Sequence, residues 1–406
     1  MRKLTIVFVD AGGGHRSAAE ALQGVLSSQA QPWDVTLLNI QEELDKLDLV
    51  RAVTGVRVQD CYNLILKKGW TRATPRLLPL LQKCIRFSHA RILRTLNQYW
   101  KQHRADLVLS VIPHFNRALV ESVHASLPGT PFVTMLTDFA DYPPHFWIER
   151  ESEYLIGGTE KAVRQAMDLG HSRKRVFRAS GMVLKPKFYA RPVLNRALER
   201  TKLGLDPECP TGIVLFGGQG SRAMIDIAER LDASPDRLQL ILLCGHNTKL
   251  ADKLRALPAK KRIFVEGFTS QVDYYMSLAD FFIGKPGPGC ISEALQFHLP
   301  VITESNAATM PQERYNAEWL VENRLGVALK SFKQVAFGVH MLLQPEMFDE
   351  FRRNAQAHTN RALFEVPEIL EEVFDRHAVQ TMPVISFPSD LNLPRPTADP
   401  AWAALT

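Results

Sequence analysis

Short, continuously apolar segments recur along the chain, and segments with helical periodicity, such as residues 17–26, lie between several of them. In the first half they lie at residues 4–9, 34–40, 107–112, 131–136, 153–158 and 176–180, and in the second half at 212–218, 238–244, 263–268, 281–285 and 300–305. Continuous apolar character is typical of strands that are buried on both faces of a parallel sheet. The alternation therefore predicts an α/β protein with two doubly wound parallel-sheet domains.

The predicted boundary between the two domains lies at GMVLKPKFYARP, which brings two prolines and three basic residues between regular elements. We expect a first domain at residues 1–182, a second domain at 190–361 and a C-terminal helix at 362–379 that returns to the first domain. Five prolines with little periodicity predict a mobile tail at residues 380–406.

The composition indicates a soluble globular protein. With 406 residues the chain exceeds what one hydrophobic core usually organises, and 46% apolar and 23% charged residues exclude the disordered and fibrous classes. No apolar segment is long enough to span a membrane or to serve as a signal peptide, so we expect a cytoplasmic protein. The five cysteines form no CxxC pair, which argues against a zinc site or a disulfide framework.

Positive charge is concentrated in one segment. From Cys61 to Ala105 the sequence has ten Lys or Arg and no Asp or Glu, although the net charge of the whole chain is only +6. Such a segment calls for an anionic partner, and its interleaved Leu, Ile and aromatic residues favour a membrane surface over nucleic acid. The alternative is a solvated helix face that covers the sheet. The candidate membrane residues are Trp70, Arg86, Arg91, Arg94 and Trp100.

Three glycine-rich turns each follow a predicted strand and open a predicted helix. They are DAGGGHRSAAEAL at residues 10–22, FGGQGSRAMIDIA at 216–228 and KPGPGCISEAL at 285–295. Exposed amides and the helix dipole at such a turn favour an anion, although a single turn of this kind is equally compatible with a tight connection. Two turns beyond the carboxyl ends of strands in one sheet predict a diphosphate site in the second half.

The order of these motifs resembles a known family. KPGPGCISEALQFHLPVI followed by MPQERYNAEWLVENRLGV, together with the upstream segments DAGGGHRSAAEAL, SVIPHFN, TDFADYPPHFW and GMVLKPKFY, is similar to the glycosyltransferases that include monogalactosyldiacylglycerol synthases, bacterial diacylglycerol glucosyltransferases and the peptidoglycan N-acetylglucosaminyltransferase. The resemblance implies the GT-B fold, in which two Rossmann-like domains enclose a cleft. It also implies UDP-galactose or UDP-glucose as donor, with no metal required.

The resemblance assigns donor-binding roles in the second half. Glu293 matches the carboxylate that grips the ribose hydroxyls, Gln312 and Glu313 match the pair that contacts the sugar hydroxyls, and Phe268 matches the position beside the uracil. For each of these the alternative is a purely structural role at a helix start or a strand end. The glycines that match the phosphate loops are Gly217, Gly218, Gly220, Gly287 and Gly289. Lys285 or Arg222 would stabilise the departing diphosphate.

On the acceptor side, His15 resembles the proposed catalytic base of the family. An attacking alcohol must lose a proton, and a positioned imidazole can contribute about 10²- to 10⁴-fold to such a step. The alternative is a histidine that only caps the helix after Gly13 and Gly14, which are themselves candidate acceptor-binding residues. Asp138 and His114 would orient His15 or contact acceptor hydroxyls.

Together these features predict an inverting transfer of hexose from a UDP-sugar to diacylglycerol by an enzyme at the inner face of a membrane. Two alternatives remain open. The acceptor is a polyprenyl-linked or other lipid saccharide, or the chain is a membrane-binding subunit without turnover. The retained His15, Glu293 and Gln312 argue against the second alternative.

Overall fold

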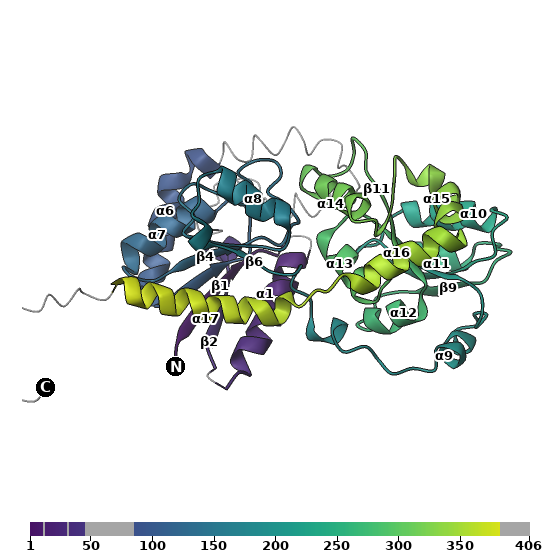
Figure 1. Ribbon diagram of the computed structural model, residues 1–406, viewed down its shortest axis with the longest axis horizontal. Coiled ribbons are helices and arrows are strands. Elements are labelled where there is room, and N and C mark those ends of the chain that lie inside the picture. The colour runs from purple at the N-terminus through teal and green to yellow at the C-terminus, as the bar shows by residue number, and fades with distance from the viewer. Residues whose placement is uncertain (11–12, 31, 45–84, 382–406) are drawn as a thin grey trace, which may run out of the picture.

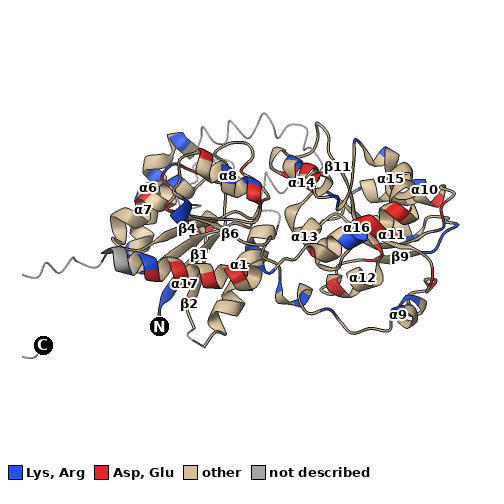
Figure 2. Cartoon of the chain, in the orientation of Figure 1, with Lys and Arg blue, Asp and Glu red and all other residues tan. Residues whose placement is uncertain are grey.

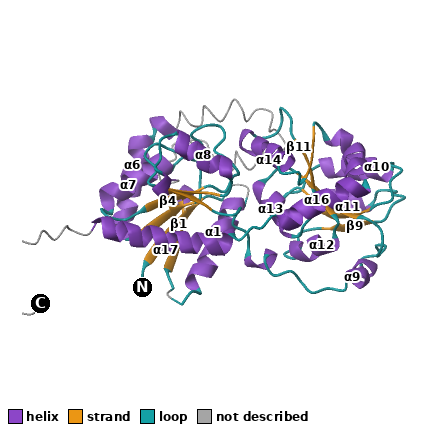
Figure 3. Ribbon diagram, viewed as in Figure 1, coloured by secondary structure: helices purple, strands orange, loops and turns teal. Residues whose placement is uncertain are grey.

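The computed structural model describes residues 1–406 except 11–12, 31, 45–84 and 382–406. Two α/β domains lie side by side, and helix α17 (Ala362–Thr381) runs from the second domain back along the first (Figure 1). Each domain contains a six-stranded parallel sheet with helices on its faces (Figure 3). The predicted fold class is therefore confirmed. Trp70 and the predicted tail at 380–406, apart from its first two residues, lie outside the described residues.

The first sheet has the strand order β2-β1-β3-β4-β5-β6. Its strands are β1 (Lys3–Phe8), β2 (Asp34–Asn39), β3 (Leu107–Ser110), β4 (Phe132–Met135), β5 (Tyr154–Gly157) and β6 (Val176–Arg178). The described helices of this domain are α1 (Gly14–Ser27), α2 (Ile40–Leu44), α6 (His89–Gln102), α7 (Asn116–Ser126) and α8 (Glu160–Asp168). Because β1, β3 and β4 are neighbours, the loops at their carboxyl ends meet at one edge.

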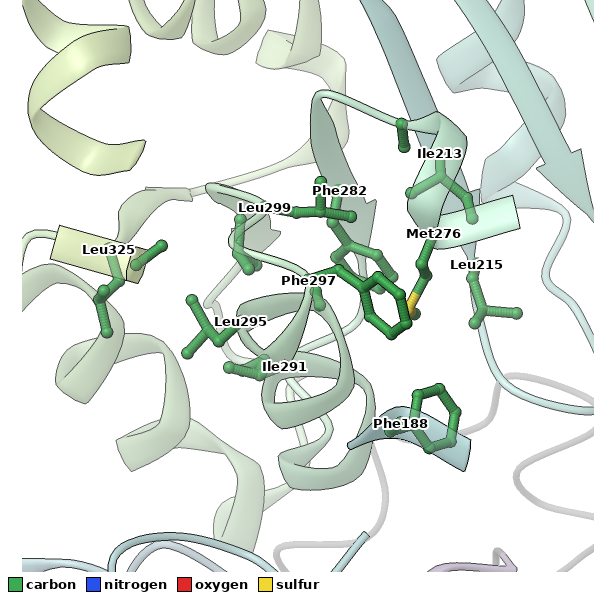
Figure 4. Packing of buried hydrophobic residues seen from close by; sticks show 14 of the residues in the cluster. Phe188, Ile213, Leu215, Met276, Phe282, Ile291, Leu295, Phe297, Leu299 and Leu325 are labelled. Carbon is green, nitrogen blue, oxygen red and sulfur yellow. The ribbon is translucent and has the colours of Figure 1, made fainter. Parts of the chain in front are cut away.

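The second sheet has the order β12-β11-β10-β7-β8-β9. Its strands are β7 (Thr211–Leu215), β8 (Gln239–Leu243), β9 (Ile263–Glu266), β10 (Phe281–Gly284), β11 (Val301–Glu304) and β12 (Gly326–Leu329). Its helices are α9 (Arg196–Lys202), α10 (Ala223–Asp232), α11 (Thr248–Arg255), α12 (Val272–Leu278), α13 (Pro288–Gln296), α14 (Pro311–Glu322), α15 (Val335–Leu342) and α16 (Pro345–Ala357). In one buried cluster, Ile291 and Leu295 of α13 pack with Phe282 of β10 (Figure 4), which fixes α13 on the sheet.

The chain passes between the domains twice, and Asn360 joins the two passages. Its buried side-chain amide donates to the Met182 carbonyl, with an N···O distance of 2.9 Å. Gly181 lies so close that an added Cβ would stand 2.7 Å from Asn360 Cγ. The Arg361 amide donates to Ser180 Oγ at 2.7 Å. A buried polar side chain of this kind is costly to leave unpaired, so it holds the two passages together.

Helix α17 then binds the first domain. Val366 and Leu370 are fully buried in its core. Trp33 Nε1 donates to Glu371 Oε1 at 2.6 Å, and the Ser180 amide donates to Glu365 Oε2 at 2.7 Å. The last helix therefore attaches the second domain to the first.

The loop after β4 and helix α8 both contact helix α14 of the other domain. The rings of Phe139 and Trp319 meet edge to face with centroids 4.6 Å apart. Lys161 Nζ lies 4.3 Å from the ring centroid of Tyr315. These contacts hold the loop after β4 and helix α8 against α14, whose first turn carries Gln312 and Glu313.

Helix α6 corrects one prediction about the basic segment. Trp100 is fully buried, and its Nε1 donates to Ser122 Oγ of α7 at 3.0 Å, so the prediction that Trp100 lies at a membrane interface is wrong. Its aromatic surface stabilises the packing of α6 on α7 instead. Arg86, Arg91 and Arg94 are exposed, and Figure 2 shows basic residues along α6. None of the described helices combines the length and apolar character of a membrane-spanning segment.

Candidate active site

The predicted acceptor side of the site is built from three neighbouring strand ends. Gly13 adopts φ 83°, a left-handed conformation that glycine tolerates, and helix α1 begins at the next residue. His15 lies in the first turn of α1, His114 follows β3 and Asp138 follows β4. Gly14 is exposed, like Gly13. The fold thus places His15, His114 and Asp138 at one edge of the sheet.

His15 is held in one tautomer by its hydrogen bonds. Its Nδ1 lies 2.9 Å from the Val111 carbonyl oxygen and 2.9 Å from Thr137 Oγ1. Since a carbonyl only accepts hydrogen bonds, we assign the proton to Nδ1, which leaves the lone pair on Nε2. Burial lowers the pKa of His15 to about 4, against a smaller opposing effect of the Val111 carbonyl. The imidazole is therefore neutral at pH 7, with its unprotonated nitrogen at Nε2.

Asp138 connects this edge to the second domain. The side chain is buried, and its Oδ2 accepts a hydrogen bond from Trp147 Nε1 at 2.9 Å. Burial raises the pKa of Asp138 to about 7, while the bond from Trp147 opposes that rise. The charges of Glu313, which raises the pKa, and of Lys285, which lowers it, act on it from the second domain. Asp138 therefore lies within electrostatic reach of the predicted donor side.

The predicted donor side is built around two turns that contact each other. Gly217 and Gly220 have φ values of 71° and 60°, and the turn they form contacts a second turn after β8. The His246 amide donates to the Gly218 carbonyl at 2.8 Å. Gly245, at φ 57°, lies so close that an added Cβ would stand 2.2 Å from the same oxygen. Our sequence analysis missed Gly245, although it too follows a strand and precedes a helix.

Lys285 and Glu313 form an ion pair beside the turn that opens α13. Lys285 Nζ lies 3.0 Å from Glu313 Oε1. A Cβ on Gly287 would stand 3.3 Å from Lys285 Cε and 3.6 Å from Glu313 Oε1, so the turn lies directly beside the ion pair. Asn316 Nδ2 donates to the Pro286 carbonyl at 2.8 Å and joins α14 to the turn. The structure thus brings Lys285, Gly287 and Glu313 together, with Gln312 next to them in the first turn of α14.

The remaining predicted donor residues occupy separate positions. Phe268 is 63% exposed after β9 and stacks on His246, with ring centroids 4.0 Å apart. His246 is a second residue that the sequence analysis missed. Glu293 lies on α13, where burial raises its pKa to about 7 and the charges of Lys187 and Lys185 oppose that rise. Gly289 is in the first turn of α13, and an added Cβ there would meet open space.

Comparison with known proteins decides the class of this site. Residues 212–373 match the glycosyltransferase family 28 C-terminal domain. The second half of the chain therefore contains a domain of the family 28 glycosyltransferases. The resemblance found in the sequence is therefore confirmed.

Named relatives of this glycosyltransferase come from plants. It is 27% identical over 346 residues to monogalactosyldiacylglycerol synthase 1, chloroplastic, of Arabidopsis thaliana, covering 82% of this chain and 63% of that protein. It is 28% identical over 426 residues to the probable monogalactosyldiacylglycerol synthase 3, chloroplastic, of Oryza sativa subsp. japonica, covering 98% of this chain and 80% of that protein.

Solved structures share the architecture of this glycosyltransferase. MurG of Acinetobacter baumannii superimposes with a TM-score of 0.60 and 13% identity, covering 91% of this chain and 99% of that one. MnaA of S. aureus, solved with UDP, superimposes with a TM-score of 0.59 and 14% identity, covering 93% and 97%. At these identities the likeness shows the fold alone.

The raised pKa of Asp138 predicts a pH-dependent effect on the stability of the glycosyltransferase. A carboxyl whose pKa rises on folding keeps its proton longer in the folded chain, so its ionisation lowers the free energy of unfolding between about pH 4 and pH 7. Asp138→Asn removes that penalty and still accepts the bond from Trp147. The stability gain over wild type, measured by urea unfolding, should be about 2 kcal/mol larger at pH 8 than at pH 5.

The matched control is Asp252→Asn, which changes an exposed aspartate of α11. It should shift the free energy of unfolding equally at both pH values. If Asp138→Asn also gave the same shift at pH 5 and pH 8, the raised pKa of Asp138 would be refuted.

Proposed function

We propose that this glycosyltransferase transfers a hexose from UDP-galactose or UDP-glucose to diacylglycerol with inversion at the anomeric carbon. The observation that carries the proposal is that the two domains contribute different groups to the candidate site. A neutral histidine with an unprotonated Nε2 lies on the first domain, and an ion pair beside a glycine turn lies on the second. The charges of that pair act on Asp138 of the first domain. The names of the plant relatives support the lipid acceptor.

In the proposed reaction the acceptor hydroxyl attacks the anomeric carbon of the sugar. The bond between that carbon and the diphosphate oxygen breaks as the new carbon–oxygen bond forms, and the hydroxyl proton passes to His15 Nε2. The departing UDP carries the negative charge. Backbone amides of the turns at 217–220 and 287–289, with the N-terminus of α13, are suited to bind it.

Lys285 is suited to exchange its partner Glu313 for the diphosphate of the donor. Its ammonium group is paired with Glu313 and partly exposed. A diphosphate bound at the turn beside Gly287 offers Lys285 a stronger anionic partner than the single carboxylate. Release of Glu313 from the pair would free that carboxylate to accept hydrogen bonds from sugar hydroxyls, which is the role the family resemblance implies.

The basic surface of α6 is suited to bring the enzyme to an anionic membrane. A helix that connects parallel strands runs antiparallel to them, so the start of α6 lies at the carboxyl edge of the sheet, where His15 lies. Arg86 acts electrostatically on Glu149, which lies with Asp138 in the connection between β4 and β5. Phe87 beside it is 95% exposed. We therefore propose peripheral docking at the cytoplasmic face of a membrane through this end of α6.

A lipid assay tests the proposed reaction directly. Purified protein with vesicles containing diacylglycerol should form one β-linked hexosyl lipid from UDP-galactose or UDP-glucose, read by mass spectrometry and nuclear magnetic resonance. A product on a polyprenyl-linked saccharide but not on diacylglycerol would support the alternative acceptor. Absence of any hexosyl lipid with either donor would overturn the proposal.

Loss of the base should slow the chemical step. In His15→Ala we expect kcat to fall about 10²- to 10⁴-fold while the affinity for UDP-sugar changes little, because His15 lies on the opposite domain. His340→Ala, which removes an exposed histidine bonded to Asp236 on the second domain, is the matched control and should retain wild-type kcat. Unchanged turnover in His15→Ala would remove His15 from the role of base.

Membrane docking should depend on the charge of the α6 surface. Reversal of Arg86, Arg91 and Arg94 to Glu should weaken co-sedimentation with anionic vesicles, because each basic residue near such a surface contributes about 1 kcal/mol. Added salt should weaken the wild type in the same way. The control reverses three exposed basic residues of the second domain, Arg230, Lys249 and Lys253. Equal binding of the wild type to neutral and anionic vesicles would contradict docking by charge.

A further inference from the structure

His114 occupies a strained position next to the proposed base. Its φ of 70° lies in the left-handed region, which a residue with a Cβ rarely adopts. The His114 amide donates to the Phe146 carbonyl at 2.8 Å. Asn116 Nδ2 donates to both the Ile112 and the Trp147 carbonyl oxygens at 3.0 Å. The surrounding hydrogen bonds thus enforce the conformation, as at sites where strain serves a function.

The two nitrogens of the His114 ring have different surroundings. Nδ1 is fully enclosed and has no hydrogen-bond partner among the described residues. The ring meets the edge of Phe146, with centroids 4.3 Å apart. Yet His114 as a whole is partly exposed, and Nε2 is not among the enclosed side-chain atoms that lack a partner in the described part of the chain. Because an enclosed N–H without an acceptor is the costlier arrangement, we assign the proton to Nε2.

His15 and His114 are therefore complementary. His15 has its proton on Nδ1 and offers a lone pair at Nε2, whereas His114 offers an N–H at Nε2. The pKa of both imidazoles is lowered to about 4, by burial for His15 and by burial together with the charge of His15 for His114. Both rings are neutral at pH 7, so they present one acceptor and one donor, a pair that suits a neutral alcohol with a second oxygen.

We propose that His114 Nε2–H donates a hydrogen bond to an oxygen of the acceptor next to the attacking hydroxyl, and so selects an alcohol with a neighbouring ester carbonyl. The inference rests on the proposed function, in which His15 takes the proton of that hydroxyl. A bond to the attacking oxygen itself would reduce its nucleophilicity, so the donor serves better on the adjacent oxygen. In a 1,2-diacylglycerol that oxygen is the carbonyl of the neighbouring ester.

Two amide substitutions of His114 distinguish the roles of its two ring nitrogens. The glutamine amide nitrogen reaches the place of histidine Nε2, whereas the asparagine amide nitrogen reaches only the place of Nδ1. Asparagine also tolerates the left-handed conformation well, so His114→Asn is a control for folding. His114→Leu removes both ring nitrogens and with them the Nε2–H donor.

With diacylglycerol in vesicles, we expect KM for the lipid to rise about 5- to 30-fold in His114→Asn and His114→Leu. His114→Gln should stay within about threefold of wild type, and KM for UDP-sugar should not change in any variant. The wild type should prefer diacylglycerol to a dialkylglycerol, whose ether oxygens accept hydrogen bonds weakly. That preference should disappear in His114→Asn and His114→Leu but persist in His114→Gln.

Several outcomes would overturn the inference. Full activity of His114→Asn would show that the Nε2 donor is dispensable, and loss in His114→Gln equal to that in His114→Leu would show that the amide does not replace it. A fall in kcat with unchanged lipid KM would assign His114 to the positioning of His15. Since every comparison is made against an active wild type, a wild type without any hexosyl product would instead refute the proposed function.

Discussion

The double passage of the chain between its domains is the constraint on which the site depends. The Asn360 amide bonded to the Met182 carbonyl and the close approach of Gly181 hold the two passages together. Helix α17 then binds the first domain through a buried apolar face and Glu371. As a result the carboxyl edge of one sheet meets helix α14 of the other domain. His15 and Asp138 come from one domain and Lys285 and Glu313 from the other, so neither domain alone contains the site.

Much of this arrangement could be predicted from the sequence, because buried parallel strands appear as continuous apolar segments and glycine-rich turns can be recognised directly. The strand that was missed, β12 (Gly326–Leu329), has four residues, two of them only partly buried, and its signal is correspondingly weak. Gly245 escaped notice because a single glycine after a strand is common. Trp100 was misplaced although Ile92, Leu96 and Trp100 share one helical face, whereas Arg91 and Arg94 are exposed.

The hydrogen bonds that orient the site could not be predicted in this way. The tautomer of His15 depends on the Val111 carbonyl, 96 residues away. The hydrogen bond that joins the two connections between the domains depends on Asn360 and Met182, 178 residues apart. Such pairs form only after both sheets have set the distance between the loops. Composition and periodicity describe which segments are buried, but they do not state which carbonyl a buried side chain will meet.

Burial has opposite effects on the acids and the histidines of the site, and the combination shapes the proposed reaction. It raises the pKa of Asp138 and lowers those of His15 and His114, so it disfavours the charged forms of these three side chains. A protonated His15 is therefore unfavourable until an anion is nearby. The departing diphosphate supplies that anion as the hydroxyl loses its proton, and in a medium of low dielectric the two new charges stabilise each other. Proton transfer to His15 is thus favoured only when the glycosidic bond to UDP breaks, which couples the two events without a charged base in the resting site.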